Sequence, residues 1–577
     1  MNPTARTGGA FRSGEARMKN KKRIGLAMLA ALLALVMLLG ACATDTGTPN
    51  DSNQPAGTKK PATEENTTGE PEVRKLKLTE FEVIYAANAT AKTKQAAELL
   101  AGALGKTAKS DVTAAGAQEI LVGVTNRGGA VDLAAKKEAT AFDLRMVGEK
   151  LVISGKNENS LVYGVKYLMG TVIERDGGAL PADYTAAYAT DNKVTVFDNL
   201  SVLDVGTPSV IYGANLQNMS AHVSYPRVIV LEHNGKNNGM MLATLQSREL
   251  ADGYRVLRST DEGKTWVEIS QVKNTAHPTL IAGWQPTIYE LPQQVGDMPA
   301  GTLIFSGCVR RPDAKSDLGT ILCVWKSTDL GKTWTHISDV ADSYISKGGN
   351  GVWEPVFDMT DDGTLVCLYS DENDKKNHSQ TLLGRSTKDG IRWSEPFEVV
   401  SLPVQGLRPG MISVVRLNNG KYLATYEIVG MFGGPIHYRT SDSLTNWGDT
   451  SKSGTQLLDS VTRIGMGTSP AVGYAPNSGK CGMLFVAGEH RLDANYDKNT
   501  VRGSDLFVSL DYGKTWTTIE NPMPYNLPEG VTAAQGYSSN FFTCADGHTV
   551  WFSQSTDWDY PTYGNKTSCK LVKLSVW

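Results

Sequence analysis

Two glutamates carry the clearest chemical signal in this chain of 577 residues. Glu354 stands in the run WEPVF, at the start of a hydrophobic stretch that a DDG turn joins to a second strand ending in Asp371 and Glu372. Glu427 follows one repeat later, in KYLATYEIVG. Two carboxyl groups brought to one place can act as a general acid and as a nucleophile or base. A strand with a polar end and a solvated turn is the alternative interpretation.

Composition limits the class of protein and of partner. The chain is longer than a single hydrophobic core usually accommodates, so two or more domains are expected. Its 58 glycines, 11 tryptophans and 21 tyrosines favour strands and turns over helices. A net charge of -3 argues against binding to nucleic acid, whose phosphates select basic surfaces. The seven cysteines lack CxxC or Cys/His spacing. The sequence therefore indicates no metal site, no cofactor and no disulfide framework.

Residues 1–42 have the pattern of an export signal. A basic run at 19–23 precedes an apolar segment at 24–39 and the sequence LGAC, which ends at Cys42. LGAC resembles the lipobox of bacterial lipoproteins. The resemblance implies cleavage before Cys42, a lipid on its thiol and a location on the extracellular face of the bacterial cell membrane; an ordinary signal peptide is the alternative. Residues 43–73 are polar and predict a disordered linker.

Residues 74–198 alternate between strand and helix patterns. Strands are expected at EFEVIYA and EILVGVT, a hairpin at FDLRMVGEKLVISG, and amphipathic helices at 91–104 and 160–172. This pattern predicts a small α/β domain. In EILVGVTNR and LVISGKNENSLVYGVKYLM it resembles the non-catalytic domain that precedes the barrel in family 20 hexosaminidases. We therefore expect an accessory domain without a catalytic site.

Residues 199–577 are predicted to consist of strands and turns with two internal repeats. The first resembles the Asp box, a hairpin turn in which Asp caps backbone amides and Trp packs the loop. It occurs at Ser259–Trp266, Ser327–Trp334, Ser386–Trp393, Ser441–Trp447 and Ser509–Trp516. The second repeat is a strand ahead of each box, with a sixth copy that has no recognisable box after it. The six copies are aligned at Arg227, Gln285, Glu354, Arg408, Ser469 and Ser538.

Six such strands predict a mainly β fold, a six-bladed sialidase-like β-propeller preceded by the small α/β domain. The innermost strand of each blade is expected to line a central funnel. The segment from Ser209 to Ala214 is a candidate for closing the last blade. Because inner strands converge, residues far apart in the chain are expected to meet at one mouth of the funnel.

The motifs WEPVF, YSDEN, HSQ, LRPGM and YE, taken in this order, resemble glycoside hydrolase family 93, the exo-α-1,5-L-arabinanases. The resemblance implies a retaining exo-acting hydrolase that releases arabinobiose from the non-reducing end of linear arabinan, with an arabinan-type polysaccharide as its partner. It also implies Glu354 as nucleophile and Glu427 as acid/base, although the two roles can be exchanged. Retention requires the two carboxyls to lie about 5 to 5.5 Å apart.

Polar and aromatic residues near these glutamates are candidates for binding sugar. Salt bridges, strand-edge hydrogen bonds and ordinary packing are the alternatives for each of them. The substrate-binding candidates are Arg227, Gln285, Trp353, Asp371, His378, Gln380, Arg408 and Tyr537. Trp284, Glu372, His490 and Arg491 are further candidates around the funnel.

Two other functions fit parts of the pattern. An exo-sialidase needs three arginines and a Tyr/Glu pair, for which Arg227, Arg408, Tyr537 and either Arg463 or Arg491 are available. A surface-anchored propeller that only binds glycan is the second. A glutamate in the third inner strand, Glu354, with a second one a blade later is not the arrangement of a sialidase. A protein that only binds glycan would not need both Glu354 and Glu427, so their presence disfavours that function.

Overall fold

The computed structural model describes residues 74–577, except 175–176, 214–222, 248–249, 251, 313–318, 344–350, 494–497, 503–504, 524–535 and 558–566. The predicted signal peptide and lipobox, including Cys42, and the linker at 43–73 lie outside the described residues. Within the described part of the chain, no helix combines the length and the apolar character needed to cross a bilayer.

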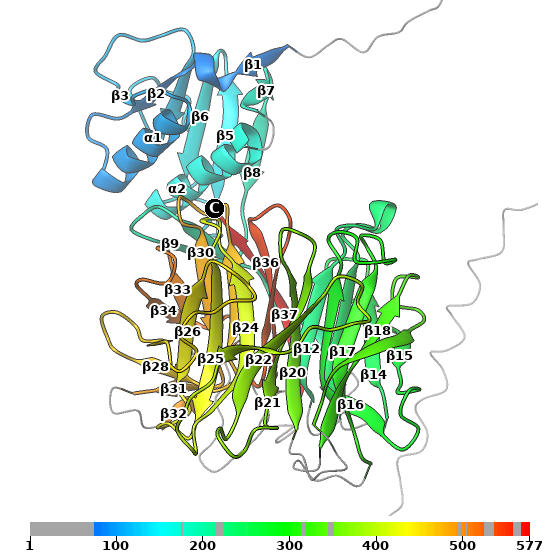
Figure 1. Ribbon diagram of the computed structural model, residues 1–577. Coiled ribbons are helices and arrows are strands. Elements are labelled where there is room, and N and C mark those ends of the chain that lie inside the picture. Colours follow the sequence, from blue (N-terminus) through cyan, green and yellow to red (C-terminus); the bar gives the residue numbers. More distant parts are fainter. Residues whose placement is uncertain are drawn as a thin grey trace, which may run out of the picture. The chain divides into compact units, whose positions relative to one another are not determined.

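The first part of the described chain is an α/β unit built on a six-stranded sheet (Figure 1). The strand order is β3-β2-β4-β6-β5-β8, with bounds Lys109–Ser110, Glu82–Tyr85, Glu119–Val122, Lys150–Gly155, Phe142–Val147 and Thr185–Tyr188. A short pair, β1 (Lys75–Lys77) and β7 (Ala179–Pro181), lies beside η1 (Leu78–Glu80). The central strand β4, EILV, is fully buried, as expected for a strand covered on both faces.

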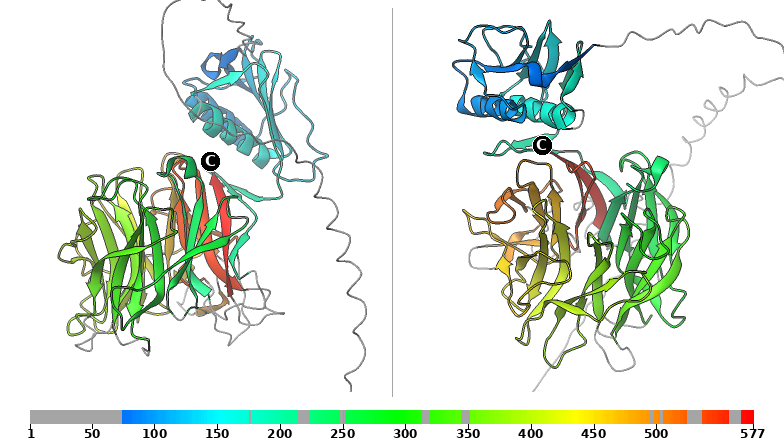
Figure 2. Two further views of the ribbon diagram at one scale, coloured as in Figure 1. Left: turned by 90° about the vertical axis from the view of Figure 1, so that its right-hand side faces the viewer. Right: turned by 45° about the horizontal axis from the view of Figure 1, so that its top comes forward.

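Two helices, α1 (Ala91–Ala103) and α2 (Glu158–Leu168), lie side by side on one face of this sheet (Figure 2). Their apolar residues pack with the sheet in one core, while Ile84, Leu121 and Val152 form a small cluster of their own. Asn157 begins α2 with a capping box, and the chain continues beyond α2 as one π-helical segment, η2 (Met169–Glu174). The predicted strands, hairpin and helices of this unit are all present.

The rest of the described chain folds into six large antiparallel sheets and one small three-stranded sheet. Five of the large sheets contain four strands each, in which neighbouring strands follow chain order. They are β12–β15 (Val223–Val230, Met241–Ser247, Tyr254–Ser259, Val267–Val272), β16–β19 (Ile281–Glu290, Leu303–Arg310, Thr320–Ser327, Thr335–Asp342), β20–β23 (Val352–Met359, Leu365–Asp371, Thr381–Thr387, Phe397–Val400), β24–β27 (Arg408–Arg416, Tyr422–Val429, Ile436–Ser441, Thr455–Gln456), and β29, β30, β33 and β34 (Ala471–Ala475, Met483–Ala487, Asp505–Ser509, Thr517–Glu520).

The first strands of successive sheets contact one another in a closed ring, in the order β12, β16, β20, β24, β29 and β35 (Asn540–Thr543). The fold is therefore a six-bladed β-propeller, as predicted. A separate hydrophobic cluster fills the space between each pair of neighbouring blades. Central strands are consequently buried on both faces, and β21 is buried along its whole length. A small sheet of β28 (Gly465–Gly467), β31 (His490–Leu492) and β32 (Lys498–Arg502) accompanies the fifth blade.

The sixth blade joins the two ends of the propeller. It contains β35, β36 (Thr549–Asp557) and β37 (Thr567–Val576), and β37 pairs with both β10 (Val202–Val205) and β11 (Ser209–Tyr212). The expected closure is confirmed at Ser209–Tyr212, and β10 adds a second closing strand. Because β9 (Lys193–Val196) pairs with β10, the predicted domain boundary at residue 198 falls inside a hairpin of this blade.

The Asp boxes form the turns between the third and fourth strands of their blades. In the first box, Asp261 Oδ1 accepts from Thr265 N at 2.9 Å, and Gly263, at φ +75°, donates its N–H to Ser259 Oγ at 2.9 Å. The third box is one residue shorter than predicted: its first residue is Thr387 and not Ser386, because Thr387 Oγ1 accepts from Gly390 N. Antiparallel strand order places all these turns at the blade ends opposite Glu354.

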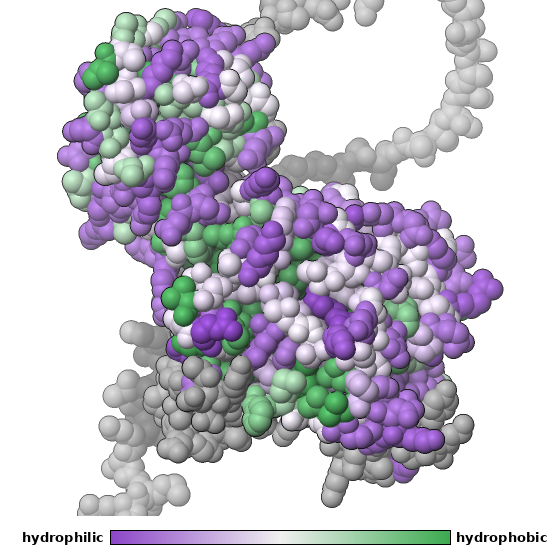
Figure 3. Space-filling view, turned by 60° about the vertical axis from the view of Figure 1, so that its left-hand side comes forward, coloured by the Kyte–Doolittle hydropathy of each residue, from purple (hydrophilic) through white to green (hydrophobic). Residues whose placement is uncertain are grey.

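The surface of the described chain has the character expected when the apolar residues of the core are packed between the blades and against the helices. On the face drawn in Figure 3, hydrophilic residues predominate and apolar residues occur in small groups. The exposed large apolar residues of the described chain are scattered along the sequence: Leu99, Val112, Val124, Val147, Val267, Ile391, Val404, Phe432 and Val461.

Candidate active site

Each blade has a residue with a left-handed backbone in its inner strand or just before it. These residues are Tyr225, Gln285, Glu354, Met411, Ser469 and Ser538, with φ between 52° and 58°. In the first four blades the strand register shifts at the same place. Such bulges redirect a side chain, and their strained backbone is typical of functional sites.

The positions of two arginines in the predicted repeat were wrong. Tyr225 and Met411 occupy the bulge in the first and fourth blades, so Arg227 lies two residues after it and Arg408 three residues before it. The bulge residue precedes proline in four blades, as YP, QP, EP and SP. Aligning on proline gives the structural register in these four blades, but in the fourth blade the proline follows Arg408 and not the bulge residue Met411.

The redirected side chains contact one another around the propeller axis. Gln285 Nε2 lies 3.2 Å from both Tyr225 Oη and Glu354 Oε1. Glu354 Oε2 accepts from Met411 N at 3.1 Å, and Ser469 Oγ lies 3.4 Å from Met411 Sδ. A cavity of about 660 Å³ contains both Glu354 and Glu427. A second cavity, of about 450 Å³, also reaches Glu354 and continues along the inner strands toward Arg416 and Pro476.

Glu354 is held by three donors. Ser370 Oγ donates to Oε2 at 2.6 Å, Met411 N donates to the same oxygen at 3.1 Å, and Gln285 Nε2 donates to Oε1 at 3.2 Å. Burial raises the pKa of Glu354 above its ordinary value, and the hydrogen bonds from Ser370 and Met411 oppose this rise. The donors stabilise the ionised carboxylate and fix its orientation.

Glu427 lies in a different environment in the next blade. It sits on β25 with 8% of its surface exposed, and Ser469 N donates to its Oε2 at 2.7 Å. Burial raises the pKa of Glu427 to about 8; the bond from Ser469 lowers it, and the nearby charge of Glu354 raises it. Glu427 is therefore mainly protonated at neutral pH. A pair of carboxyls whose surroundings separate their pKa values can supply an acid and a nucleophile or base.

Five of the predicted binding residues line the cavity of the two glutamates: Gln285, Trp353, Gln380, Arg408 and Tyr537. Arg408 forms an ion pair with Glu372 and donates to Gln380 Oε1 at 2.7 Å. Gln380 Nε2 in turn donates to Pro409 O at 2.9 Å. This network fixes polar groups at the wall of the cavity, where they can meet sugar hydroxyls.

The sequence analysis missed three further polar residues that line the cavity, Lys375, Ser379 and Gln405. They lie on the loops that follow β21 and β23, and Ser379 Oγ donates to Gln405 Oε1 at 3.1 Å. These residues could have been found from their position, because their loops lie next to the YSDEN, HSQ and LRPGM motifs in the sequence. Ser370, the strongest donor to Glu354, was also missed, although it stands within the YSDEN motif.

Three predicted binding residues lie elsewhere. Arg227 lines the second cavity and donates to Ser538 Oγ at 2.7 Å, which ties the first blade to the sixth. Asp371 is buried and accepts from Asn373 N at 2.7 Å, so it holds a turn. His378 contacts Leu402 O and Ser401 Oγ through its two ring nitrogens. For these residues the structure supports the alternative interpretation of a structural contact.

The further candidates also have structural contacts. Trp284 packs against Trp353 with ring centroids 6.0 Å apart and carries the Arg310 guanidinium over its ring. His490 Nε2 lies 3.0 Å from Gly433 O, and Arg491 pairs with Asp505. Among the described residues that line the cavity of Glu354 and Glu427, Arg408 is the one arginine. The three-arginine arrangement of a sialidase is therefore not formed there.

This propeller resembles solved structures of an α-L-arabinofuranosidase and of an α-L-arabinanase. An α-L-arabinofuranosidase from Fusarium graminearum, of glycoside hydrolase family 93 and in complex with arabinobiose, is 27% identical with a TM-score of 0.51, covering 64% of this chain and 97% of that one. A mutant of the Fusarium enzyme in which a glutamate is replaced by alanine, in complex with an iminosugar inhibitor, is 26% identical with a TM-score of 0.52, covering 64% and 98%.

An α-L-arabinanase from Penicillium chrysogenum in complex with arabinobiose is also similar, at 26% identity and a TM-score of 0.52, covering 65% of this chain and 98% of that one. A family model described as the BNR-Asp box repeat matches residues 506–519, which contain the fifth box and most of its two flanking strands. No curated protein matches the sequence significantly. The similar structures are thus glycoside hydrolases that share the propeller.

Proposed function

We propose that this protein is a retaining, exo-acting glycoside hydrolase that cleaves α-1,5-linked arabinan and releases arabinobiose from the non-reducing end. The observation that carries the proposal is the placement of Glu354 and Glu427 in one cavity, with the pKa of Glu427 raised to about 8. Support for the substrate comes from the similar fungal structures, two of which contain arabinobiose.

In the proposed reaction, Glu427 gives its proton to the glycosidic oxygen as the bond to the leaving sugar breaks. The Glu354 carboxylate attacks the anomeric carbon at the same time and forms a glycosyl ester. Glu427, now ionised, takes a proton from water, whose oxygen attacks the anomeric carbon and frees Glu354. Three hydrogen bonds to the Glu354 carboxylate favour its ionised form, which is why we assign it as the nucleophile.

The substrate proposal is tested by incubating the protein with linear arabinan, debranched arabinan and sialyllactose and identifying products by chromatography. Arabinobiose is expected from the arabinans. Free sialic acid would instead support a sialidase, and measurable binding without any product would support a glycan-binding propeller.

The assignment of the glutamates is tested with Glu354→Gln and Glu427→Gln. Each is expected to lower kcat by about 10²-fold or more while ligand affinity is retained. Asp358→Asn is a matched control, because Asp358 lies on the same strand, β20, but lines the second cavity. Appreciable activity of Glu354→Gln would contradict the assignment.

Azide distinguishes the two roles in alanine variants. Azide attacking directly in place of a missing nucleophile inverts the anomeric centre, whereas azide attacking a glycosyl-enzyme ester gives net retention. We expect an inverted glycosyl azide from Glu354→Ala and a retained one from Glu427→Ala. The opposite pattern would exchange the roles.

We also propose that the protein is anchored to the extracellular face of the bacterial membrane by a lipid on Cys42. The support is the sequence LGAC after a basic and apolar segment. A Cys42→Ala variant is expected to lose lipid labelling and membrane fractionation. Retention of the lipid label in that variant would exclude Cys42 as the attachment site.

A further inference from the structure

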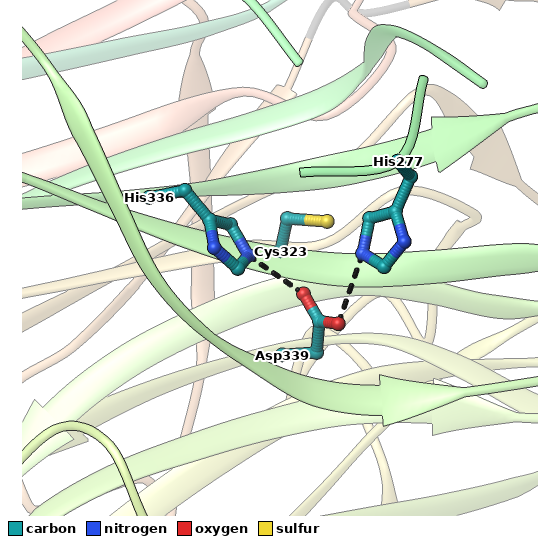
Figure 4. Close-up of side chains that lie close together, drawn as sticks. All are labelled: His277, Cys323, His336 and Asp339. Carbon is teal, nitrogen blue, oxygen red and sulfur yellow. Dashed lines mark hydrogen bonds and ion pairs between the residues drawn. The ribbon is translucent and has the colours of Figure 1, made fainter. Parts of the chain in front are cut away.

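A second group of chemically capable side chains lies in the second blade, away from the two glutamates. His277, Cys323, His336 and Asp339 each offer one ligand atom, and these four atoms lie within 4.8 Å of one another. Figure 4 shows both imidazole rings directed at the Asp339 carboxylate, with the Cys323 thiol between them. His277 Nε2 lies 3.0 Å from Asp339 Oδ2, and His336 Nε2 lies 2.8 Å from Oδ1.

Three of these residues are brought together by an irregularity in the sheet. Cys323 on β18 pairs directly with Asp339 on β19. His336 and Asp339 are three residues apart, so a regular strand would point them to opposite faces. A register shift between the pairs Val324–Ser338 and Trp325–His336 inserts Ile337 as an extra residue. This bulge brings His336 to the side of Asp339 and Cys323.

His277 comes from a separate segment, the loop between β15 and β16. Asn274 holds that loop: its Oδ1 accepts from His277 N at 3.1 Å, and its Nδ2 donates to His277 O at 2.6 Å and to Leu280 O at 2.7 Å. The imidazole is therefore presented to the sheet by a hydrogen-bonded turn. A bound ion would connect this loop to β18 and β19.

We propose that His277, Cys323, His336 and Asp339 form a structural binding site for a transition metal ion, with Zn²⁺ as the expected occupant. Two nitrogens, one sulfur and one carboxylate oxygen are ligands that zinc accepts in a four-coordinate site, whereas Ca²⁺ and Mg²⁺ require oxygen ligands. A thiolate and a carboxylate would balance the charge of a divalent ion, and the thiol proton would pass to solvent on binding.

The dimensions of the cluster suit such an ion. Zinc bonds of about 2.0 to 2.3 Å place tetrahedral ligand atoms roughly 3.3 to 3.8 Å apart. The present separations, none above 4.8 Å, therefore need to shorten by about 1 to 1.5 Å at most, and the two His–Asp contacts of 3.0 and 2.8 Å need to lengthen slightly. Cys323 is fully buried, while the His277, His336 and Asp339 side chains are 27%, 21% and 33% exposed. An ion can therefore enter from solvent and reach the thiol at the base of the site.

The test uses the whole protein, prepared without a metal-affinity tag, stripped with a chelator and titrated with Zn²⁺ or Co²⁺. One ion per chain is expected to bind, and Zn²⁺ is expected to raise the midpoint of thermal unfolding. Co²⁺ should give the intense visible bands of tetrahedral coordination together with a thiolate charge-transfer band in the near ultraviolet. Absence of stoichiometric binding by both ions would overturn the proposal.

Variants show whether these residues are the ligands. Cys323→Ser is expected to lose the charge-transfer band, and His277→Asn, in a partly exposed loop, to lose binding without unfolding. Cys367→Ser is the control for a buried thiol and His233→Ala the control for an exposed histidine; both should bind as the parent protein does. An unchanged cobalt spectrum in Cys323→Ser would contradict the proposal, and thermal unfolding without metal checks that each variant is folded.

Discussion

Gln285 and Glu354 of neighbouring inner strands are joined by two reciprocal hydrogen bonds. Gln285 Nε2 donates to Glu354 Oε1 at 3.2 Å, and the Glu354 N–H donates to Gln285 Oε1 at 3.2 Å. Both residues have a left-handed backbone, with φ of 53° and 58°. The hydrogen bonds therefore hold the bulged segments of the two neighbouring blades together. They also fix the orientation of the Glu354 carboxylate.

Replacing Gln285 by Glu should move the acid limb of the pH–activity profile to higher pH. A second carboxylate beside Glu354 raises the pKa of Glu354, and activity requires Glu354 to be ionised. We expect kcat/KM at neutral pH to fall by about 10²-fold, with partial recovery as pH rises. Gln293→Glu, at the opposite end of the blade, is the control. A profile of unchanged shape in Gln285→Glu would contradict this role.

Glu427 should make both activity and stability decrease at alkaline pH. Its pKa is raised from 4.5 to about 8 in the folded protein, so between these values the folded state binds more protons than the unfolded state. The stability that this group contributes is complete below its unfolded pKa and is lost as pH rises through about 8. Activity is expected to fall over the same range, because the acid loses its proton.

The variant Glu427→Gln removes this titration. Urea unfolding of both proteins from pH 5 to 9 should show the variant gaining stability relative to the parent as pH rises. An equal pH dependence in the two proteins would show that Glu427 does not titrate in this range.

Gly410→Ala should damage the site without unfolding the propeller. Gly410 pairs with Glu427 across β24 and β25, and an added Cβ would lie 2.6 Å from Gln380 Nε2 and 3.6 Å from both Glu427 Oε1 and Ser370 Oγ. Displacement of Gln380 is expected to lower kcat/KM by about 10²-fold. Gly102→Ala, where an added Cβ meets nothing within 4 Å, should leave activity unchanged. Steady-state kinetics on arabinan decide the outcome.

Asp261→Ala should lower stability and leave catalysis intact. Thr265 donates to Asp261 through its hydroxyl and its backbone N–H, and these bonds lower the pKa of Asp261 to about 2. The stability they give is present above the unfolded pKa and is lost as pH falls through about 2. Thermal unfolding at neutral pH should shift down by about a few degrees. A large loss of kcat would mean that the box affects the distant site.

Much of the fold was predictable because it repeats. The Asp boxes combine a fixed spacing with side chains that cap their own turns, and such local interactions are written directly in the sequence. The same holds for the helices and the hairpin of the α/β unit, whose apolar periodicity is local. Glu354 and Glu427 could be predicted as candidates from the repeat. WEPVF aligns with the inner strands of the other blades, and KYLATYEIVG aligns with the second strand of the next blade.

The sequence by itself determined the strands, the turns and the number of blades, since each depends on residues close together in the chain. Only the tertiary structure decided which side chains face the axis, because one bulged residue reverses the direction of every side chain after it. That is why Arg227 lies outside the cavity of the glutamates. Lys375 and Gln405 line this cavity and His378 does not, because these residues lie in loops whose course depends on tertiary contacts. For the same reason the ligand atoms of His277, Cys323, His336 and Asp339 meet only in the folded blade.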